Sequence, residues 1–413
     1  MTTLDPAAPD PAAPDPAALD AADPLAAWTS HFVRSDDVLA YLDGNSLGRP
    51  MTATADRFRR FLAEDWGARL IRSWDEQWMD LPTAIGDRIG AITLGAAAGQ
   101  TVVADSTTVL LYKAIRSALR ARPDRDEIVI DDDQFPTDRF VVEGIAAEHG
   151  ATVRWVHVDP ALGVTVDDLR TVVGPRTAVV LVNHVSYRSA YIADMPGITA
   201  LVHEVGGLVV WDLCHSAGVV PMQLDAWQVD LAVGCTYKFL NGGPGAPAFL
   251  YARGVLHAEL TPPIQGWMGA EDVFAMADGY RPAPSIRRFV SGTPPITGML
   301  AMQDMLDAIE GAGIEAVRNK STALTEYALR LVDEHLVPLG VQVASPRDAA
   351  VRGSHVMIRH AEFRRVVAGL WDRGVVPDFR NPDGLRIGLS PLSTTFAEVA
   401  AGVEAIREEL AAG

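Results

Sequence analysis

One lysine stands between an apolar segment and a glycine-rich segment, a position that suits an amine held for chemistry. Lys238 lies in the run GCTYKFLNGGPGAPAFLY, residues 234–251. The apolar residues just before it predict a buried strand, and the NGGPGAP after it can continue neither a helix nor a strand. Burial takes water from an ammonium group and favours the neutral amine, which can condense with an aldehyde. From this segment alone, a surface lysine on a loop is an equally good interpretation.

A carboxylate and an imidazole follow another apolar run. Asp212 ends the strand-like part of GGLVVWDLCHSAG, residues 206–218, and His215 comes three residues later. Ligands of open α/β sheets bind at such strand ends. The carboxylate can hold a protonated pyridine nitrogen and the histidine can reach a ring oxygen, as pyridoxal phosphate requires. Taken singly, Asp212 is better explained as a helix N-cap and His215 as a helix-face residue. Together with Lys238 they favour a cofactor site.

The segments that must position these groups alternate between strand and helix patterns. Strands are predicted at 101–105, 127–133, 152–159, 177–186 and 207–212, with helices between them. This alternation predicts an α/β fold with a mostly parallel sheet covered on both faces. Beyond residue 300, longer amphipathic helices and the strands 354–360 and 384–390 predict a smaller α+β domain.

Four parts of the chain are expected from this pattern. Residues 1–24 repeat Pro, Ala and Asp without an aromatic or basic side chain, and we expect them to be disordered. Residues 25–55 are expected to pack with the small domain. Residues 56–299 should form the large cofactor-binding domain and residues 300–413 the small one.

Composition narrows the functional classes. The net charge of -18 repels nucleic acid and anionic membranes, and no window has the ~20 apolar residues of a membrane span. The two cysteines, Cys214 and Cys235, lie in apolar segments and are interpreted as core residues. A disulfide framework and a thiolate metal site are therefore not expected, and no metal is predicted. A reducing cytoplasm is the expected location.

Nine motifs occur in a specific order. They are YLDGNSLG (41–48), LIRSWDEQW (70–78), VVADSTTV (102–109), FPTDRF (135–140), WDLCHSAG (211–218), GCTYKFLNGGPGAPAF (234–249), GWMG (266–269), GYRPAPSIRRFVSGTPPI (279–296) and LRIGLSPL (385–392). In this order the chain resembles the kynureninases, fold-type-I pyridoxal phosphate enzymes of the aspartate aminotransferase superfamily, over nearly all residues from 30 onward. The resemblance implies a mostly parallel seven-stranded sheet between helices in the large domain, and a small α+β domain.

The resemblance also implies roles in cofactor binding. Lys238 is expected to carry pyridoxal phosphate as a Schiff base, Asp212 to hold the ring nitrogen, and Tyr237 to bind phosphate and take part in proton transfer. The other implied contacts are Thr107, Thr108, Phe135, Pro136, Thr137, Asp138, Ser189, His215, Trp267 and Thr293. Trp267 and Thr293 are implied to reach the phosphate across a homodimer interface. From the residues alone, hydroxyls opening a helix suit a phosphate, although without the neighbouring motifs a plain cap explains them better.

The implied substrate is an amino acid. Arg386 is expected to bind its α-carboxylate, with Ser46 and Trp74 nearby, and the implied reaction is hydrolysis of L-kynurenine, or its 3-hydroxy form, to anthranilate or 3-hydroxyanthranilate and L-alanine. The family usually has glycine, histidine and tyrosine where this chain has Ala190, Ala270 and Ser393, so the aryl pocket stays open.

Other activities remain alternatives on the same scaffold. They are an aminotransferase, a cysteine desulfurase, an enzyme for a modified kynurenine, and a cofactor-binding sensor without turnover. The pathway served, tryptophan catabolism or NAD synthesis among others, also stays open.

Overall fold

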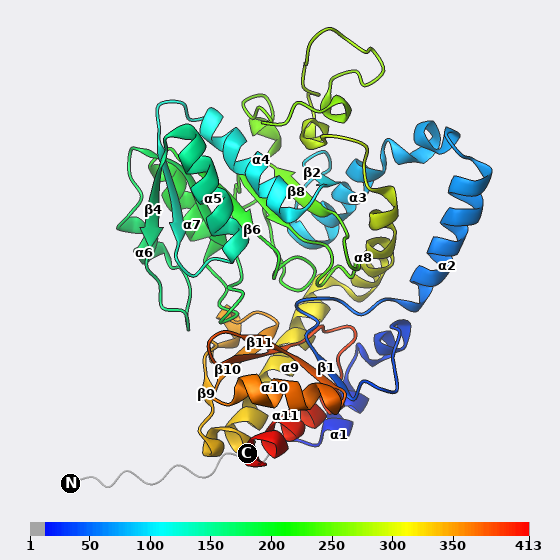
Figure 1. Ribbon diagram of the computed structural model, residues 1–413, viewed down its shortest axis with the longest axis vertical. Helices are drawn as coiled ribbons and strands as arrows, with labels where there is room; N and C mark the ends of the chain where they lie inside the picture. Colours follow the sequence, from blue (N-terminus) through cyan, green and yellow to red (C-terminus); the bar gives the residue numbers. More distant parts are fainter. Residues whose placement is uncertain (1–12, 413) are drawn as a thin grey trace.

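A computed structural model describes residues 13–412, in which a seven-stranded sheet forms the larger part (Figure 1). Its strands are β2 Thr101–Ala104, β3 Glu127–Asp131, β4 Thr152–Val156, β5 Thr177–Asn183, β6 Leu208–Asp212, β7 Leu231–Gly234 and β8 Ala248–Ala252. The order is β2-β8-β7-β6-β5-β3-β4, and β8 runs antiparallel to both of its neighbours while the other pairs are parallel. The predicted α/β class and mostly parallel sheet are confirmed.

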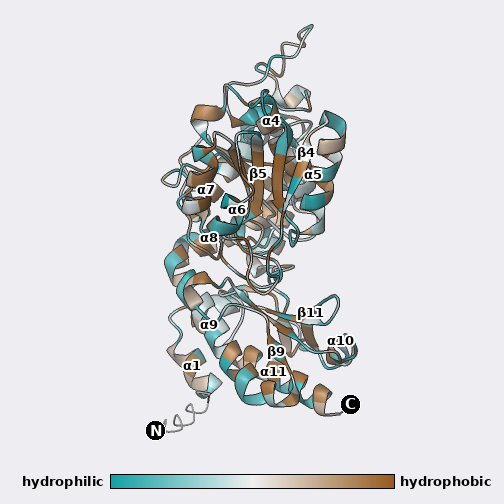
Figure 2. Ribbon diagram, turned by 90° about the vertical axis from the view of Figure 1, so that its left-hand side faces the viewer, coloured by the Kyte–Doolittle hydropathy of each residue, from teal (hydrophilic) through white to brown (hydrophobic). Residues whose placement is uncertain are grey.

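Helices cover both faces of this sheet because the strands are apolar on both sides. The helices of this part are α2 Thr52–Arg60, α3 Leu81–Ile89, α4 Thr107–Arg120, α5 Pro136–His149, α6 Val166–Arg170, α7 Met195–Glu204 and α8 Leu300–Ala312. On β5, Val180 and Val182 pack into one cluster with α3, α7 and α8, whereas Val179 and Leu181 pack into another with α4 and α5. Figure 2 shows the apolar strands in brown between their helices. Such two-sided burial is typical of a parallel sheet.

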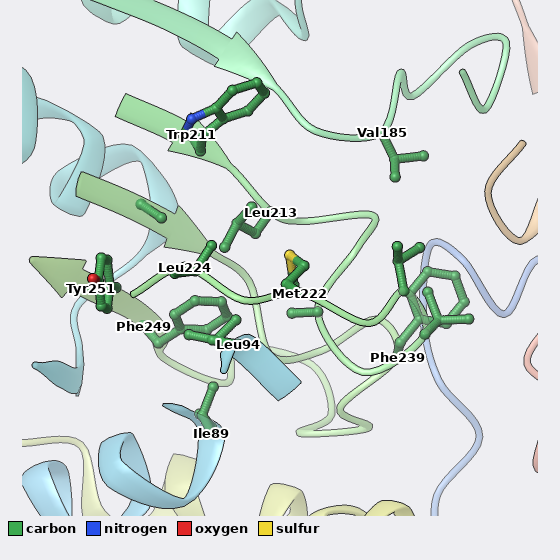
Figure 3. Close-up of a cluster of buried hydrophobic side chains, with 14 of the residues drawn as sticks. Ile89, Leu94, Val185, Trp211, Leu213, Met222, Leu224, Phe239, Phe249 and Tyr251 are labelled. Carbon is green, nitrogen blue, oxygen red and sulfur yellow. The ribbon is translucent and has the colours of Figure 1, made fainter. Parts of the chain in front are cut away.

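The first of these clusters fixes the strand that ends in Asp212. Trp211 is fully buried, and its indole Nε1 donates a hydrogen bond to Thr199 Oγ1 at 3.3 Å. Figure 3 shows Trp211 and Leu213 in the same cluster as Phe249 and Tyr251 of β8. Close packing around Trp211 therefore holds the end of β6 in place.

A five-stranded sheet forms the smaller part of the molecule, below the large sheet in Figure 1. Its strands are β1 Ala40–Leu42, β9 Gln342–Val343, β10 His355–Arg359, β11 Val375–Arg380 and β12 Gly384–Gly388, and its helices are α9 Ile314–His335, α10 Phe363–Asp372 and α11 Phe396–Ala411. The order is β1-β11-β12-β10-β9, so a strand from residues 40–42 joins the C-terminal sheet in parallel with β11.

The two parts are joined through α8 and α9. Apolar residues of α8, including Met302 and Ile309, pack in the core of the large sheet. Val317 at the start of α9 packs there too, while residues from Leu324 onward pack in the core of the small sheet. One helix thus belongs to both cores. Within residues 13–412, no helix has the length and apolarity needed to cross a membrane.

The expected disorder of residues 1–24 is wrong for residues 13–24, and residues 1–12 lie outside the described part. Helix α1, Pro16–Ala22, starts at a proline whose missing N–H is not needed in a first turn, and Asp15 caps it by accepting from Ala17 N at 3.2 Å. Leu19 packs on the small core. Asp20 accepts from the backbone N–H of Phe396 and of Ala397 at 2.8 and 3.0 Å. Asp15 and Asp20, part of the repeat that predicted disorder, act as helix caps.

Candidate active site

A pocket opens at the C-terminal edge of the large sheet. It encloses about 630 Å³, including space open to solvent. Polar groups at the ends of β5 and β6 and after β7 line it, together with the loops that start α4 and α5. Its lining residues are Ser106, Thr107, Thr108, Phe135, Thr137, Asp138, Asn183, Val185, Tyr187, Asp212, Cys214, His215, Tyr237 and Lys238. Parallel strands converge their carboxyl ends at one edge, which is why residues so far apart in sequence meet here.

Lys238 differs from the other lysines of the chain. There are three lysines, and the other two are buried against carboxylates: Lys113 lies 2.5 Å from Asp105 and Lys320 lies 2.6 Å from Asp23. Within the described residues Lys238 has no carboxylate partner in an ion pair, and it is half-buried in the pocket wall. It is therefore the lysine whose amine is available to a ligand.

An imidazole lies directly beside this amine. The Nζ atom of Lys238 is 3.0 Å from Nε2 of His215. Burial, and then the charges of Lys238 and Arg386, hold the pKa of His215 well below its usual value. A neutral imidazole accepts a hydrogen bond from the lysine, and the buried Nδ1 atom of His215 has no partner among the described residues.

Two acidic side chains, Asp138 and Asp212, lie next to each other in the pocket lining. Asp212 Oδ1 accepts from Cys214 N at 2.7 Å, which orients the carboxylate at the end of β6. Burial, and next the charge of Asp212, raise the pKa of Asp138 well above its usual value. Burial beside Asp212 thus favours the protonated form of Asp138, and its buried Oδ2 atom has no partner among the described residues. A protonated ring nitrogen placed here would supply the positive charge that this pair lacks.

The start of α4 suits an anionic group. Ser106 is the N-cap, with its Oγ accepting from Val109 N at 3.4 Å, and Thr107 and Thr108 form the first turn, where backbone N–H groups lack helix partners. Tyr237, the residue before Lys238, also lines the pocket, and burial raises the pKa of its hydroxyl, so it remains a hydrogen-bond donor. With the unpartnered atoms of His215 and Asp138, this set fits the phosphate, ring oxygen and ring nitrogen of pyridoxal phosphate.

A buried arginine from the small sheet adds a positive charge next to the pocket. Arg386 on β12 is 1% exposed and donates to Tyr187 O at 2.8 Å and to Ser46 Oγ at 2.6 Å. Burial lowers its pKa to about 10, so it stays charged at neutral pH. Because Tyr187 lines the pocket, this contact connects the guanidinium to the wall of the site.

Besides Arg386 and Ser46, five predicted site residues lie outside the pocket lining of this chain. Ser189 is fully buried, and its hydroxyl donates to Leu162 O at 2.6 Å. Trp74 packs edge-on against Trp78 at 5.3 Å. Pro136 starts α5, and Trp267 and Thr293 are exposed. The roles of all five stay predictions.

Besides Ser106, the N-cap of α4, four lining residues were not predicted to be functional. Asn183 is the last residue of β5, Val185 and Tyr187 follow it, and Cys214, interpreted as a core residue, lies between Asp212 and His215. Tyr187 meets Phe135 edge-on with ring centres 5.4 Å apart. Asn183 is the polar residue that ends the apolar run TAVVLVN, just as Asp212 ends the apolar run before it. The same pattern could therefore have identified Asn183.

Known structures show the same fold. A cysteine desulfurase from Escherichia coli matches with a TM-score of 0.79 at 17% identity, covering 94% of this chain and 98% of that one. A cysteine desulfurase from Thermococcus onnurineus NA1 matches with a TM-score of 0.77 at 18% identity, covering 91% and 95%. At such low identity these matches show the fold alone.

Sequence relatives are more specific. Residues 84–245 match the family "Cys/Met metabolism PLP-dependent enzyme", and residues 317–406 match "Kynureninase C-terminal domain". The kynureninase of Pseudomonas fluorescens is 41% identical over 398 residues, covering 94% of this chain and 93% of that protein. The kynureninase of Burkholderia pseudomallei (strain K96243) is 38% identical over 394 residues, with the same coverage. With a pocket whose groups fit pyridoxal phosphate and relatives that match almost end to end, the chain belongs to the kynureninase family of pyridoxal-phosphate-dependent enzymes.

Proposed function

We propose that this protein hydrolyses L-kynurenine, or 3-hydroxy-L-kynurenine, to anthranilate or 3-hydroxyanthranilate and L-alanine. The observation that carries the proposal is the pairing of Lys238 with neutral His215 in a pocket that Asp212 also lines. Water supplies the atoms that balance the cleavage, so no second substrate is needed.

Pyridoxal phosphate supplies an aldehyde for amines and a protonated ring that withdraws electrons from the substrate's α-carbon. Asp212 would hold the proton at the ring nitrogen, and Asp138 lies beside Asp212, whose charge helps to raise the Asp138 pKa. Phe135, whose ring meets Tyr187 edge-on, would pack on the cofactor ring. Thr107, Thr108 and Tyr237 would hold the phosphate by hydrogen bonds.

Lys238 moves the proton at the substrate's α-carbon once it is free as an amine, because it is the one lysine in the pocket. His215 accepts a hydrogen bond from that amine and so keeps Nζ directed into the pocket. Arg386 orients the substrate through its α-carboxylate, which fixes the α-proton relative to Lys238.

We also infer a homodimer in the cytoplasm. Trp267 is 47% exposed on a segment that carries further exposed apolar side chains, Phe274 and Met276 among them. Exposed apolar clusters of this kind support an interface between two copies. In such a dimer Trp267 and Thr293 would reach the partner's phosphate site.

A cysteine desulfurase is a poorer fit. Cys214 is the cysteine in the pocket lining, and its hydrogen bond with Cys235, then burial, raise the pKa of its thiol well above the usual value. A neutral, buried thiol is a weak nucleophile. An aminotransferase would require a keto acid for turnover, so activity is compared with and without a keto acid.

The test uses the purified holoenzyme and the fluorescence of anthranilate. Wild-type protein should release anthranilate from L-kynurenine without a keto acid, and turnover only with a keto acid would instead establish an aminotransferase. Borohydride reduction of the holoenzyme should place the cofactor label on the peptide of Lys238, a distinct result because the chain has three lysines. Lys238→Ala should lose both the label and the activity, and full cleavage by this variant would refute the assignment.

A further inference from the structure

The guanidinium of Arg386 has few free hydrogen-bond donors before any substrate arrives. A guanidinium has five N–H groups. Nε donates to the side-chain oxygen of Asn45 at 3.0 Å, in the amide orientation in which the Asn45 nitrogen donates to Asp43. Nη1 donates to Tyr187 O at 2.8 Å, and Nη2 donates to Ser46 Oγ at 2.6 Å. Nη2 also lies 2.7 Å from Oδ2 of Asp378. One N–H, on Nη1, is left.

Asp378 is shared between two arginines. It lies directly opposite Arg386 in the antiparallel pair of β11 and β12. The same Oδ2 atom accepts from Nε of Arg380 at 2.6 Å. The Arg386 side chain is 1% exposed, whereas that of Asp378 is 17% and that of Arg380 is 32% exposed. Asp378 and Arg380 therefore have contact with solvent that Arg386 lacks.

A substrate carboxylate that binds two N–H groups at one edge of the guanidinium must displace one of these partners. Ser46 is neutral and adds no repulsion to an incoming anion. Asp378 is negatively charged and repels it, so the contact of Asp378 with Nη2 is the one that substrate binding weakens most. Asp378 can turn away from Arg386 without becoming an unpaired charge because Arg380 still holds its Oδ2 atom.

We propose that Asp378 is a displaceable counter-ion of Arg386, and that Arg380 holds it when an amino-acid carboxylate takes its place. The inference rests on the proposed role of Arg386 in binding the substrate's carboxylate. In the free enzyme Asp378, at 2.7 Å, is the nearer of two carboxylates that balance the buried guanidinium, the other being Asp43 at 3.8 Å, and it positions the guanidinium. In the complex the substrate provides that balance. Asp378 and Arg380 are thus positioning residues that set the affinity for carboxylate ligands.

The test is calorimetric binding to the holoenzyme of L-alanine and of L-alaninamide, which has no carboxylate. Asp378→Asn keeps the shape and removes the competing charge, so L-alanine should bind about three-fold or more tightly. Arg380→Gln leaves the bonds of Arg386 in place but removes the second holder of Asp378, so L-alanine should bind about three-fold or more weakly. The double variant should behave like Asp378→Asn, because Arg380 acts through Asp378. Asp383→Asn, which breaks the pair with Arg359 in the same sheet, is the control for loss of one negative charge.

L-Alaninamide should bind all variants equally. Weaker binding of L-alanine to Asp378→Asn, or parallel changes for the amide, would show a purely structural role and overturn the inference. If Asp378→Asn unfolds, unchanged L-alanine affinity in Arg380→Gln would also overturn it. Anthranilate release from L-kynurenine is measured separately on wild-type protein. If that release is absent while the L-alanine effects are present, the proposed function fails and the counter-ion inference stands.

Discussion

Asp20 provides a sharp test of how the N-terminal segment supports the small sheet. Its two carboxylate oxygens accept from the first two backbone N–H groups of α11, at 2.8 and 3.0 Å. Thr395 caps the same helix through a third N–H, of Glu398. Asp20→Ala removes the acceptor of the first two N–H groups, and each lost cap bond costs about 0.5–1 kcal/mol. Loss of the negative charge at the helix N-terminus adds about 0.5 kcal/mol.

The expected loss for Asp20→Ala is therefore about 2 kcal/mol in the local stability of α11. A difference of this size corresponds to about thirty-fold in an opening equilibrium. Amide hydrogen exchange followed by mass spectrometry should show α11 peptides exchanging faster by about that factor. Asp20→Asn keeps an acceptor and loses the charge, so we expect about half the free-energy change.

Asp15→Ala serves as the matched control, because Asp15 caps α1 itself and does not touch α11. Its effect on exchange should be confined to residues 16–22. Unchanged exchange of α11 in Asp20→Ala would refute the view that the N-terminal helix stabilises the small sheet.

Two further predictions concern the active site. Asp212→Asn keeps the oxygen that accepts from Cys214 N, so the fold should persist while kcat falls at least about 100-fold and cofactor affinity drops, measured by anthranilate release and by cofactor titration; activity within two-fold of wild type would separate Asp212 from the ring nitrogen. If Trp267 acts across the dimer, mixing and refolding inactive Lys238→Ala and Trp267→Ala chains should restore up to about a quarter of the wild-type activity, since half of the dimers would hold one intact site; no recovery would place Trp267 outside the partner's site.

The position of the site could be predicted from the sequence because it depends on a general rule of parallel sheets. Lys238, Asp212 and Thr107 each follow an apolar run, and the carboxyl ends of parallel strands meet at one edge. Their chemical types then indicated the cofactor. His215 was expected near the ring and lies beside Lys238.

Other features depend on pairings that no local pattern records. The bond between Arg386 and Asp378 follows from the register of β11 and β12, which places the two residues opposite each other. A shift of this register by one residue would put their side chains on different faces of the sheet. Strand β1 joins the C-terminal sheet because a partner edge is available more than three hundred residues away in the sequence. The N-terminal aspartates suggested disorder by composition, and their role as helix caps appears only with α11 beside them.

Helix α9 has its first turn in one hydrophobic core and the rest in the other. The lysine and the acid that flank the cofactor pocket belong to the large sheet, whereas Arg386 belongs to the small one. A change in the bend of this helix would therefore move the carboxylate-binding arginine as a unit with its sheet, and leave the distance between Lys238 and Asp212 unchanged. Affinity for the amino acid and affinity for the cofactor can in this way vary independently within a single chain.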